Sequence, residues 1–173
     1  MASYYYLISS LPMLRADSAM PFSYDTFLSM CQTCVDAKTY KLLENLSVNS
    51  TEGPLVEDWA RFYQVLAHEL NYQRNLKLGR PCDQPIERDE ETSRTVAAAL
   101  NAKNPLEAEL LLLKLEFAKL DELTSLHYFD AYTLFGYAMK LKLLQRLTVF
   151  DTPKGQAEFK RLFDGIQAQI LSI

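Results

Sequence analysis

The hydrophobic positions between Leu126 and Asp151 repeat with the period of an α-helix on two sides of the chain. At about 100° per residue they form two nearly opposite stripes. One stripe is Tyr132, Phe135, Met139, Leu143 and Phe150, and the other is Leu134, Tyr137, Leu141 and Leu144. Only Gly136 interrupts the segment, and Asp151-Thr152-Pro153 supplies a stop. We therefore expect one long helix over residues 126–151, lying between neighbouring helices.

The rest of the chain also has helical periodicity, broken by turn and cap signals. The expected helices cover 4–14, where strand propensity competes, then 23–35, 36–46, 54–78, 88–102, 105–124 and a last segment from Pro153. Helices 23–35 and 36–46 are expected to form a hairpin, while Pro54 and Asn104-Pro105 mark helix starts. The sequence predicts an all-α, multi-helix bundle of about six to seven helices. It forms one domain, 1–173, with a possible boundary between two helical lobes at 79–88, where two prolines interrupt the periodicity.

Composition narrows the class of partner. The 173 residues are 49% hydrophobic and 23% charged, which is ordinary for a folded domain. A net charge of −4 gives no basic field for nucleic acid, so none is expected as a partner. No apolar run approaches the ~20 residues that span a bilayer. The amino terminus lacks a basic leader region and three cysteines fit a reducing compartment, so we expect a cytoplasmic chain.

Few residues suggest catalysis. Cys31-Gln32-Thr33-Cys34 has the spacing of a redox dithiol or half a zinc site, but both thiols fall in a helical pattern, and buried small residues are the simpler interpretation. His68-Glu69 begins like a zinc-protease motif, yet Tyr72 replaces the second histidine. The glutamates of the 105–124 helix are expected to form a solvated face: Glu107, Glu109, Glu116 and Glu122. We expect no active site, no metal and no cofactor; a helical enzyme using the cysteines or histidines remains an alternative.

Aromatic and basic residues point to contacts instead. Tyr4, Tyr5 and Tyr6 cannot all face one core, so one or two are expected to offer an amphipathic surface. Lys140, Lys142 and Arg146 sit on an otherwise apolar helix. Acidic groups within the fold are their first expected partners, and another protein is the alternative.

Two stretches carry a family resemblance: SYYYLISSLPML near the start and YFDAYTLFGYAMKLKLLQRLTVFDTPKGQAEFKRL near the end. Together they resemble a bacterial family of small helical proteins encoded beside V-type ATPase genes. The second stretch is also similar to the C/d-type subunit family of V/A-type rotary ATPases. The similarity lies in Tyr137, Ala138, Lys140, Leu141, Leu144 and Arg146, followed by a glycine-containing break at Gly155.

The resemblance implies a non-catalytic component that couples the central stalk to the membrane rotor ring and supports proton or sodium transport. Such a chain lies at the cytoplasmic face of the membrane through the complex and takes no small-molecule substrate. This chain is about half as long as the C/d-type proteins, so a three-lobed funnel is not assumed. The positions implied for partner contact or for the family fold are Tyr5, Leu11, Pro12, Tyr137, Lys140 and Arg146. The alternative is a helical adaptor or assembly protein that binds a soluble partner through its tyrosine-rich amino terminus.

Overall fold

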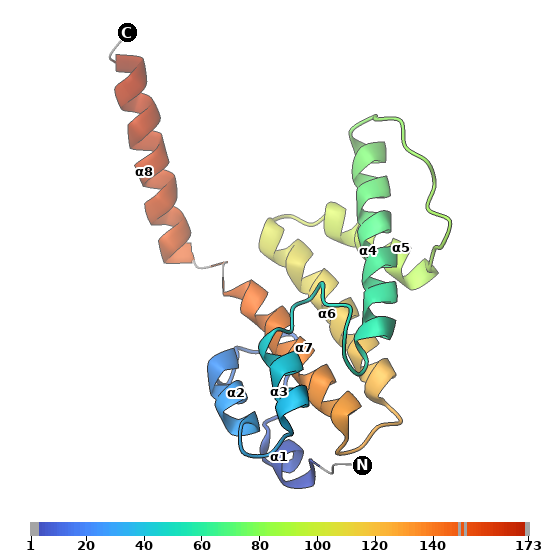
Figure 1. Ribbon diagram of the computed structural model, residues 1–173. Helices are drawn as coiled ribbons and strands as arrows, with labels where there is room; N and C mark the ends of the chain where they lie inside the picture. The colour runs from blue at the N-terminus through green and yellow to red at the C-terminus, as the bar shows by residue number, and fades with distance from the viewer. Residues whose placement is uncertain (1–3, 149, 151, 172–173) are drawn as a thin grey trace.

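The computed structural model describes residues 4–148, 150 and 152–171, and this part of the chain is all-helical (Figure 1). The predicted fold class is therefore confirmed. Eight helices occur where six to seven were expected, since the ambiguous amino-terminal stretch forms a short helix of its own. They are α1 (Tyr5–Ser10), α2 (Tyr24–Cys31), α3 (Ala37–Glu44), α4 (Val56–Lys77), α5 (Glu90–Leu100), α6 (Pro105–Thr124), α7 (Ala131–Leu147) and α8 (Thr152–Leu171).

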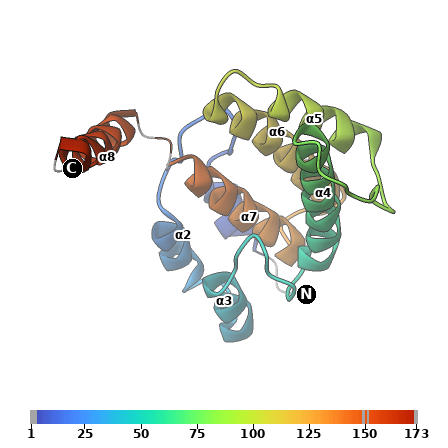
Figure 2. The ribbon, with the colours of Figure 1, turned by 90° about the horizontal axis from the view of Figure 1, so that it is seen from above.

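Helix α7 lies at the centre of the bundle, as its two apolar stripes predict. Figure 2 shows α2 and α3 on one side of it and α4, α5 and α6 on the other. Within the helix, Tyr132 and Tyr137 are partly buried, and the other members of the two stripes are fully buried: Leu134, Phe135, Met139, Leu141, Leu143 and Leu144. A second, smaller core joins α4, α5 and α6 around Leu66, Val96 and Leu115. Residues Phe62 and Tyr63 touch both cores, so the two groups of helices are continuous.

Side-chain caps fix most helix starts. Ser23, Asp36, Asp89, Asn104 and Asp130 each accept a hydrogen bond from the backbone N–H three residues on, which satisfies an otherwise unpaired donor of the first turn. The predicted α2–α3 hairpin forms, and the Tyr24 hydroxyl donates across it to the carbonyl of Leu43 at 2.7 Å.

Two predicted helix starts were too early. Residues 126–130 are not part of α7, because Phe129 takes a left-handed conformation (φ 53°) and Asp130 caps a helix that begins at Ala131. In the same way, Leu55 has φ 68°, so α4 begins at Val56 rather than at Pro54. The expected stop residue Asp151 lies outside the described residues.

Other details of the sequence prediction were also wrong. Helix α7 ends at Leu147, which leaves Phe150 outside it and partly exposed. Leu106 has the spacing of the apolar face predicted for the 105–124 helix, together with Leu110, Leu113, Phe117 and Leu120, but it is exposed in the first turn of α6. Gly155 does not break the chain, because it lies within α8.

The 79–88 stretch, where the sequence predicted a possible boundary, is a connector between α4 and α5. The boundary itself stays a prediction.

Helix α8 extends away from the bundle (Figure 1). Among the described residues, the helix pairs that pack most extensively lie within α2 to α7 and do not include α8. Its apolar side chains are consequently exposed: Phe159, Leu162, Phe163 and Ile166. Among the described helices, including α8, none is both long enough and apolar enough to cross a membrane.

Candidate functional site

An apolar groove runs between the segment 8–17 and helices α6 and α7, and we call it the α1–α7 groove. It encloses about 810 Å³. One wall is the chain that leaves α1, and the other is the carboxy-terminal half of α6 with the facing side of α7. Its lining includes Leu11, Pro12, Met13, Phe117, Tyr137 and Lys140. The groove therefore brings together four of the six positions implied by the family resemblance: Leu11, Pro12, Tyr137 and Lys140.

Tyr137 attaches the amino-terminal segment to α7. Its hydroxyl donates a hydrogen bond to the carbonyl of Pro12 at 3.0 Å. Burial raises the pKa of Tyr137 to about 12, so the hydroxyl keeps its proton near neutral pH and remains a donor. On its other side the ring stacks on Phe27 of α2, with centroids 5.7 Å apart. The two stretches that carry the resemblance are thus in direct contact.

A second contact holds α1 against the start of α7. The Tyr4 N–H donates to the carbonyl of Phe129 at 2.9 Å, and the Tyr5 ring packs on the Phe129 ring with centroids 4.6 Å apart. The left-handed conformation of Phe129 belongs to this arrangement, because it places the residue beneath α1 just before the Asp130 cap. The amino-terminal segment is therefore attached on both sides of α1, at Tyr4 and Tyr5 before the groove and at Pro12 within it.

Gly136 sets the width of the groove at its base. A Cβ atom on this residue would lie 2.6 Å from Cγ2 of Thr124, a distance that real Cβ contacts do not reach. Only glycine lets the end of α6 approach α7 this closely. Thr124 and Gly136 both line the groove, so the same close approach that packs the helices also shapes the site.

Charged side chains of both signs surround the apolar floor. Lys140 pairs with Asp121, with Nζ and Oδ1 2.5 Å apart, and lies over the Phe117 ring at 5.5 Å from its centroid. At the opposite end Arg15 pairs with Asp17. Met13 stands on the rim with 88% of its surface exposed. An apolar floor with a rim of paired charges suits binding of an amphipathic segment of another protein.

The remaining two positions implied by the resemblance lie elsewhere. Tyr5 sits on the outer side of α1, half exposed, between Tyr6 and Phe129. Tyr4 is buried while Tyr6 is 86% exposed, which agrees with the expectation that the three tyrosines divide between core and surface. Arg146 lies in the α6–α7 interface and does not reach the groove.

Arg146 bridges two glutamates of α6. Its guanidinium donates to Glu116 through Nη1 (3.0 Å) and Nη2 (2.6 Å), and to Glu109 through Nε. Burial alone would lower the pKa of Arg146, but the two carboxylates outweigh it and raise that pKa. This pairing corrects the prediction of a solvated glutamate face, since Glu116 is only 1% exposed and Glu109 is largely covered. The internal partners expected for Arg146 are present.

The other two basic residues of α7 also have partners within the fold. Lys140 has Asp121, as described above. Lys142 lies over the ring of Tyr24 at 3.6 Å from its centroid, and burial lowers the pKa of this lysine. The three basic residues thus connect α7 to α6 and α2.

The candidate redox and metal residues do not form a cluster. Cys31 is buried at the end of α2, and burial, with Cys34 nearby, raises its pKa to about 12. Reactive cysteines instead have lowered pKa values. Cys34 is exposed in the turn after α2, not inside a helix as predicted. His127 stacks on Tyr132 and pairs with Asp130. In the described part of the chain, no three His, Cys, Asp or Glu side chains converge in a way that fits a metal ion.

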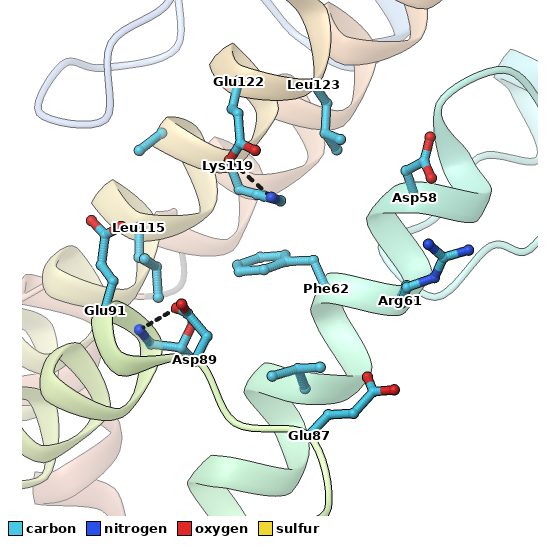
Figure 3. Close-up of a pocket in the computed structure, with 13 residues that line it drawn as sticks. Asp58, Arg61, Phe62, Glu87, Asp89, Glu91, Leu115, Lys119, Glu122 and Leu123 are labelled. Atoms are coloured by element: carbon cyan, nitrogen blue, oxygen red, sulfur yellow. Dashed lines mark hydrogen bonds and ion pairs between the residues drawn. The ribbon is translucent and has the colours of Figure 1, made fainter.

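Sequence reasoning missed a second cleft, of about 570 Å³, between α4, α5 and α6 (Figure 3). Figure 3 shows Phe62 in its middle with charged side chains around it. Several of these have other roles: Asp89 caps α5 by accepting from the N–H of Thr92 at 2.8 Å, and Lys119 pairs with Glu122 on α6. The acidic run before α5 signalled a helix start and gave no sign of a cleft.

Met13 and Phe117 are groove residues that sequence reasoning also missed. Met13 follows Pro12, after which the apolar spacing of the amino-terminal segment does not continue, and Phe117 has the spacing of an ordinary core position of α6.

Comparison of the chain with protein-family models, with curated proteins and with solved structures gives no match.

Proposed function

We propose that this chain is a non-catalytic component of a V/A-type rotary ATPase, of the C/d type, that couples the central stalk to the membrane rotor ring. In this role it supports proton or sodium transport without acting on a small molecule or needing a cofactor. It is held at the cytoplasmic face of the membrane by the complex. The α1–α7 groove is the surface through which it contacts a protein of the stalk or the ring.

One observation carries the proposal. The two sequence stretches that resemble the ATPase-associated proteins lie more than 100 residues apart in the chain, yet they meet at the hydrogen bond between Tyr137 and Pro12. Their contact borders the α1–α7 groove, and four of the six positions implied by the resemblance line that groove: Leu11, Pro12, Tyr137 and Lys140. A docking role would account for a surface of this kind, because its floor is apolar and its charges are largely paired.

Co-purification tests this proposal. A tagged chain, expressed in cells that contain a V/A-type ATPase, is expected to retain central-stalk or rotor-ring proteins. Met13→Glu places a charge on the groove rim and should abolish this retention. Ile86→Glu is the matched control, since Ile86 is a fully exposed apolar residue in the connector between α4 and α5. Absence of the wild-type chain from intact ATPase preparations, or equal retention by both variants, would contradict the proposal.

A second function is favoured by the exposed aromatic rings of α1. Tyr5 and Tyr6 pack edge to face, with centroids 5.5 Å apart, and leave most of the Tyr6 ring in solvent. Under this alternative the chain is an adaptor or assembly protein that binds a soluble partner through its amino terminus. Tyr6→Ser would then release a partner that does not belong to the ATPase, while Met13→Glu would leave that partner bound.

A further inference from the structure

The face of α8 that carries its large apolar residues has no partner among the described helices. Phe159, Leu162, Phe163 and Ile166 fall within about 100° of one another around the helix and are between 54% and 70% exposed. Their spacings of three and four residues form the stripe by which helices pair. The other positions of α8 whose side-chain exposure the structure describes are polar or small.

The composition of α8 disfavours an isolated helix. Its 20 residues include Gly155 and Gly165, each of which costs about 1 kcal/mol relative to alanine in a helix interior. Most helices in proteins are stabilised by packing of an apolar face rather than by helix propensity. The conformation of α8 therefore implies that another surface covers this stripe.

The charges of α8 favour a second copy of this chain over a membrane. Helices that lie on membranes carry an excess of Lys and Arg on the polar face. Helix α8 has three basic residues, Lys154, Lys160 and Arg161, and two acidic ones, Glu158 and Asp164, and Glu158 already pairs with Arg161. A helix whose charges nearly cancel has little attraction for anionic lipid and little repulsion for an identical helix.

The positions of these charges also favour one direction of pairing. At 100° per residue, Glu158 borders one edge of the stripe and Lys160 borders the other. When two identical helices pack in parallel, unlike edges meet, so Glu158 faces the side of the partner helix that carries Lys160. An antiparallel pair would bring like edges, and hence like charges, together.

The area is sufficient for a reversible dimer. Four side chains of this size and exposure present roughly 400 Å² of apolar surface per helix, so a pair buries roughly 800 Å² before the flanking atoms are counted. Specific interfaces begin at about 1,000 Å², and the flanking atoms of two 20-residue helices supply the remaining area.

We propose that α8 pairs in parallel with α8 of a second copy of this chain through Phe159, Leu162, Phe163 and Ile166. This inference does not depend on the ATPase proposal.

Sedimentation velocity of the full chain over a range of about 1–100 µM tests the pairing. The wild type is expected to shift from monomer to dimer as concentration rises. Leu162→Glu places a charge within the stripe and should leave a monomer throughout. Ala157→Glu adds the same charge on the opposite side of α8 and should dimerise like the wild type. Because α8 does not pack on the bundle, thermal unfolding of the bundle should be the same in all three proteins.

Disulfide trapping tests the direction. The background for this test is Cys34→Ser with Cys82→Ser, and the oxidant is diamide, which accepts the electrons of the two thiols. In this background Leu162→Cys should give a covalent dimer, because equivalent positions face one another in a parallel pair. Ala157→Cys should not. A wild type that stays monomeric, a dimer unaffected by Leu162→Glu, or Leu162-dependent binding of a monomer to vesicles of anionic phospholipid would each overturn the proposal. Failure of trapping at 162 in a dimer that Leu162→Glu disrupts would overturn the parallel arrangement.

Discussion

Arg146 and Glu116 form a bidentate ion pair across the α6–α7 interface. Nη1 of the arginine lies 3.0 Å from Oε1 of the glutamate, and Nη2 lies 2.6 Å from Oε2. The glutamate is almost completely buried, so water cannot replace the arginine if it is removed. Glu109 accepts from Nε of the same guanidinium, and the three groups together hold α7 against α6.

Replacement of Arg146 by Met should therefore lower the free energy of unfolding by about 3 kcal/mol, since a buried carboxylate loses its partner. Adding Glu116→Leu should recover most of that loss, because an apolar pair of similar volume needs no desolvated charge. Urea denaturation of the single and double variants measures both effects. Arg161→Met, which breaks an exposed pair on α8, should produce no measurable change; equal effects at the two arginines would contradict the argument.

Gly136 is expected to tolerate no side chain unless its neighbour becomes smaller. Gly136→Ala brings a Cβ to 2.6 Å from Cγ2 of Thr124, and forcing the helices apart should cost about 1–3 kcal/mol. Thr124→Ser removes that methyl group and keeps the hydroxyl that donates to the carbonyl of Leu120, so the double variant should regain most of the stability. Thermal unfolding compares the variants. Gly155→Ala, in open space on α8, is the control and should not lower the unfolding temperature.

The helices could be predicted from the sequence because their signals are local. Apolar positions three and four residues apart, with Ser23, Asp36 or Asn104 before them, predicted both the faces and the starts of several helices. The start of α4 could not be predicted in this way, because the left-handed Leu55 precedes it and no side chain caps it. The start of α7 did have a local signal, the Asp130 cap, but the apolar pattern that continues on its amino-terminal side concealed it.

Contacts between residues far apart in the chain explain the other differences between the sequence prediction and the structure. Glu116 looks like a solvated residue in the sequence, and its burial depends on Arg146, which lies 30 residues away. The groove is similar: Leu11 and Pro12 belong to one resembling stretch and Tyr137 and Lys140 to another, but no periodicity indicates that they face one another. Met13 and Phe117 join the site only through that packing.

Stability should decrease in acid because of Glu69. This buried carboxylate accepts two hydrogen bonds from Arg88, at 2.9 and 2.7 Å, and another from Gln73, and these lower its pKa from the ordinary 4.5. The unfolded chain then binds a proton more readily than the folded one, so the stabilisation is present above about pH 4.5 and is lost as the pH falls through the lower folded value. Urea unfolding between pH 6 and 3 should show this slope, and Glu69→Gln should flatten it. An unchanged slope would contradict this role for Glu69.

The hydrogen bond from Tyr137 to Pro12 should control the order of the groove wall more than the stability of the bundle. Tyr137→Phe keeps the ring stacked on Phe27 and removes only the donor, which should cost about 1 kcal/mol. The larger effect should be local, because this bond attaches the chain after α1 to α7. Amide hydrogen exchange in residues 11–17 should accelerate, with exchange in α6 unchanged. Tyr6→Phe is the control: it removes an exposed hydroxyl and should change neither the stability of the bundle nor hydrogen exchange in residues 11–17. If Tyr137→Phe leaves exchange in 11–17 unchanged, other contacts hold this wall, and the groove does not depend on the bond between its two stretches.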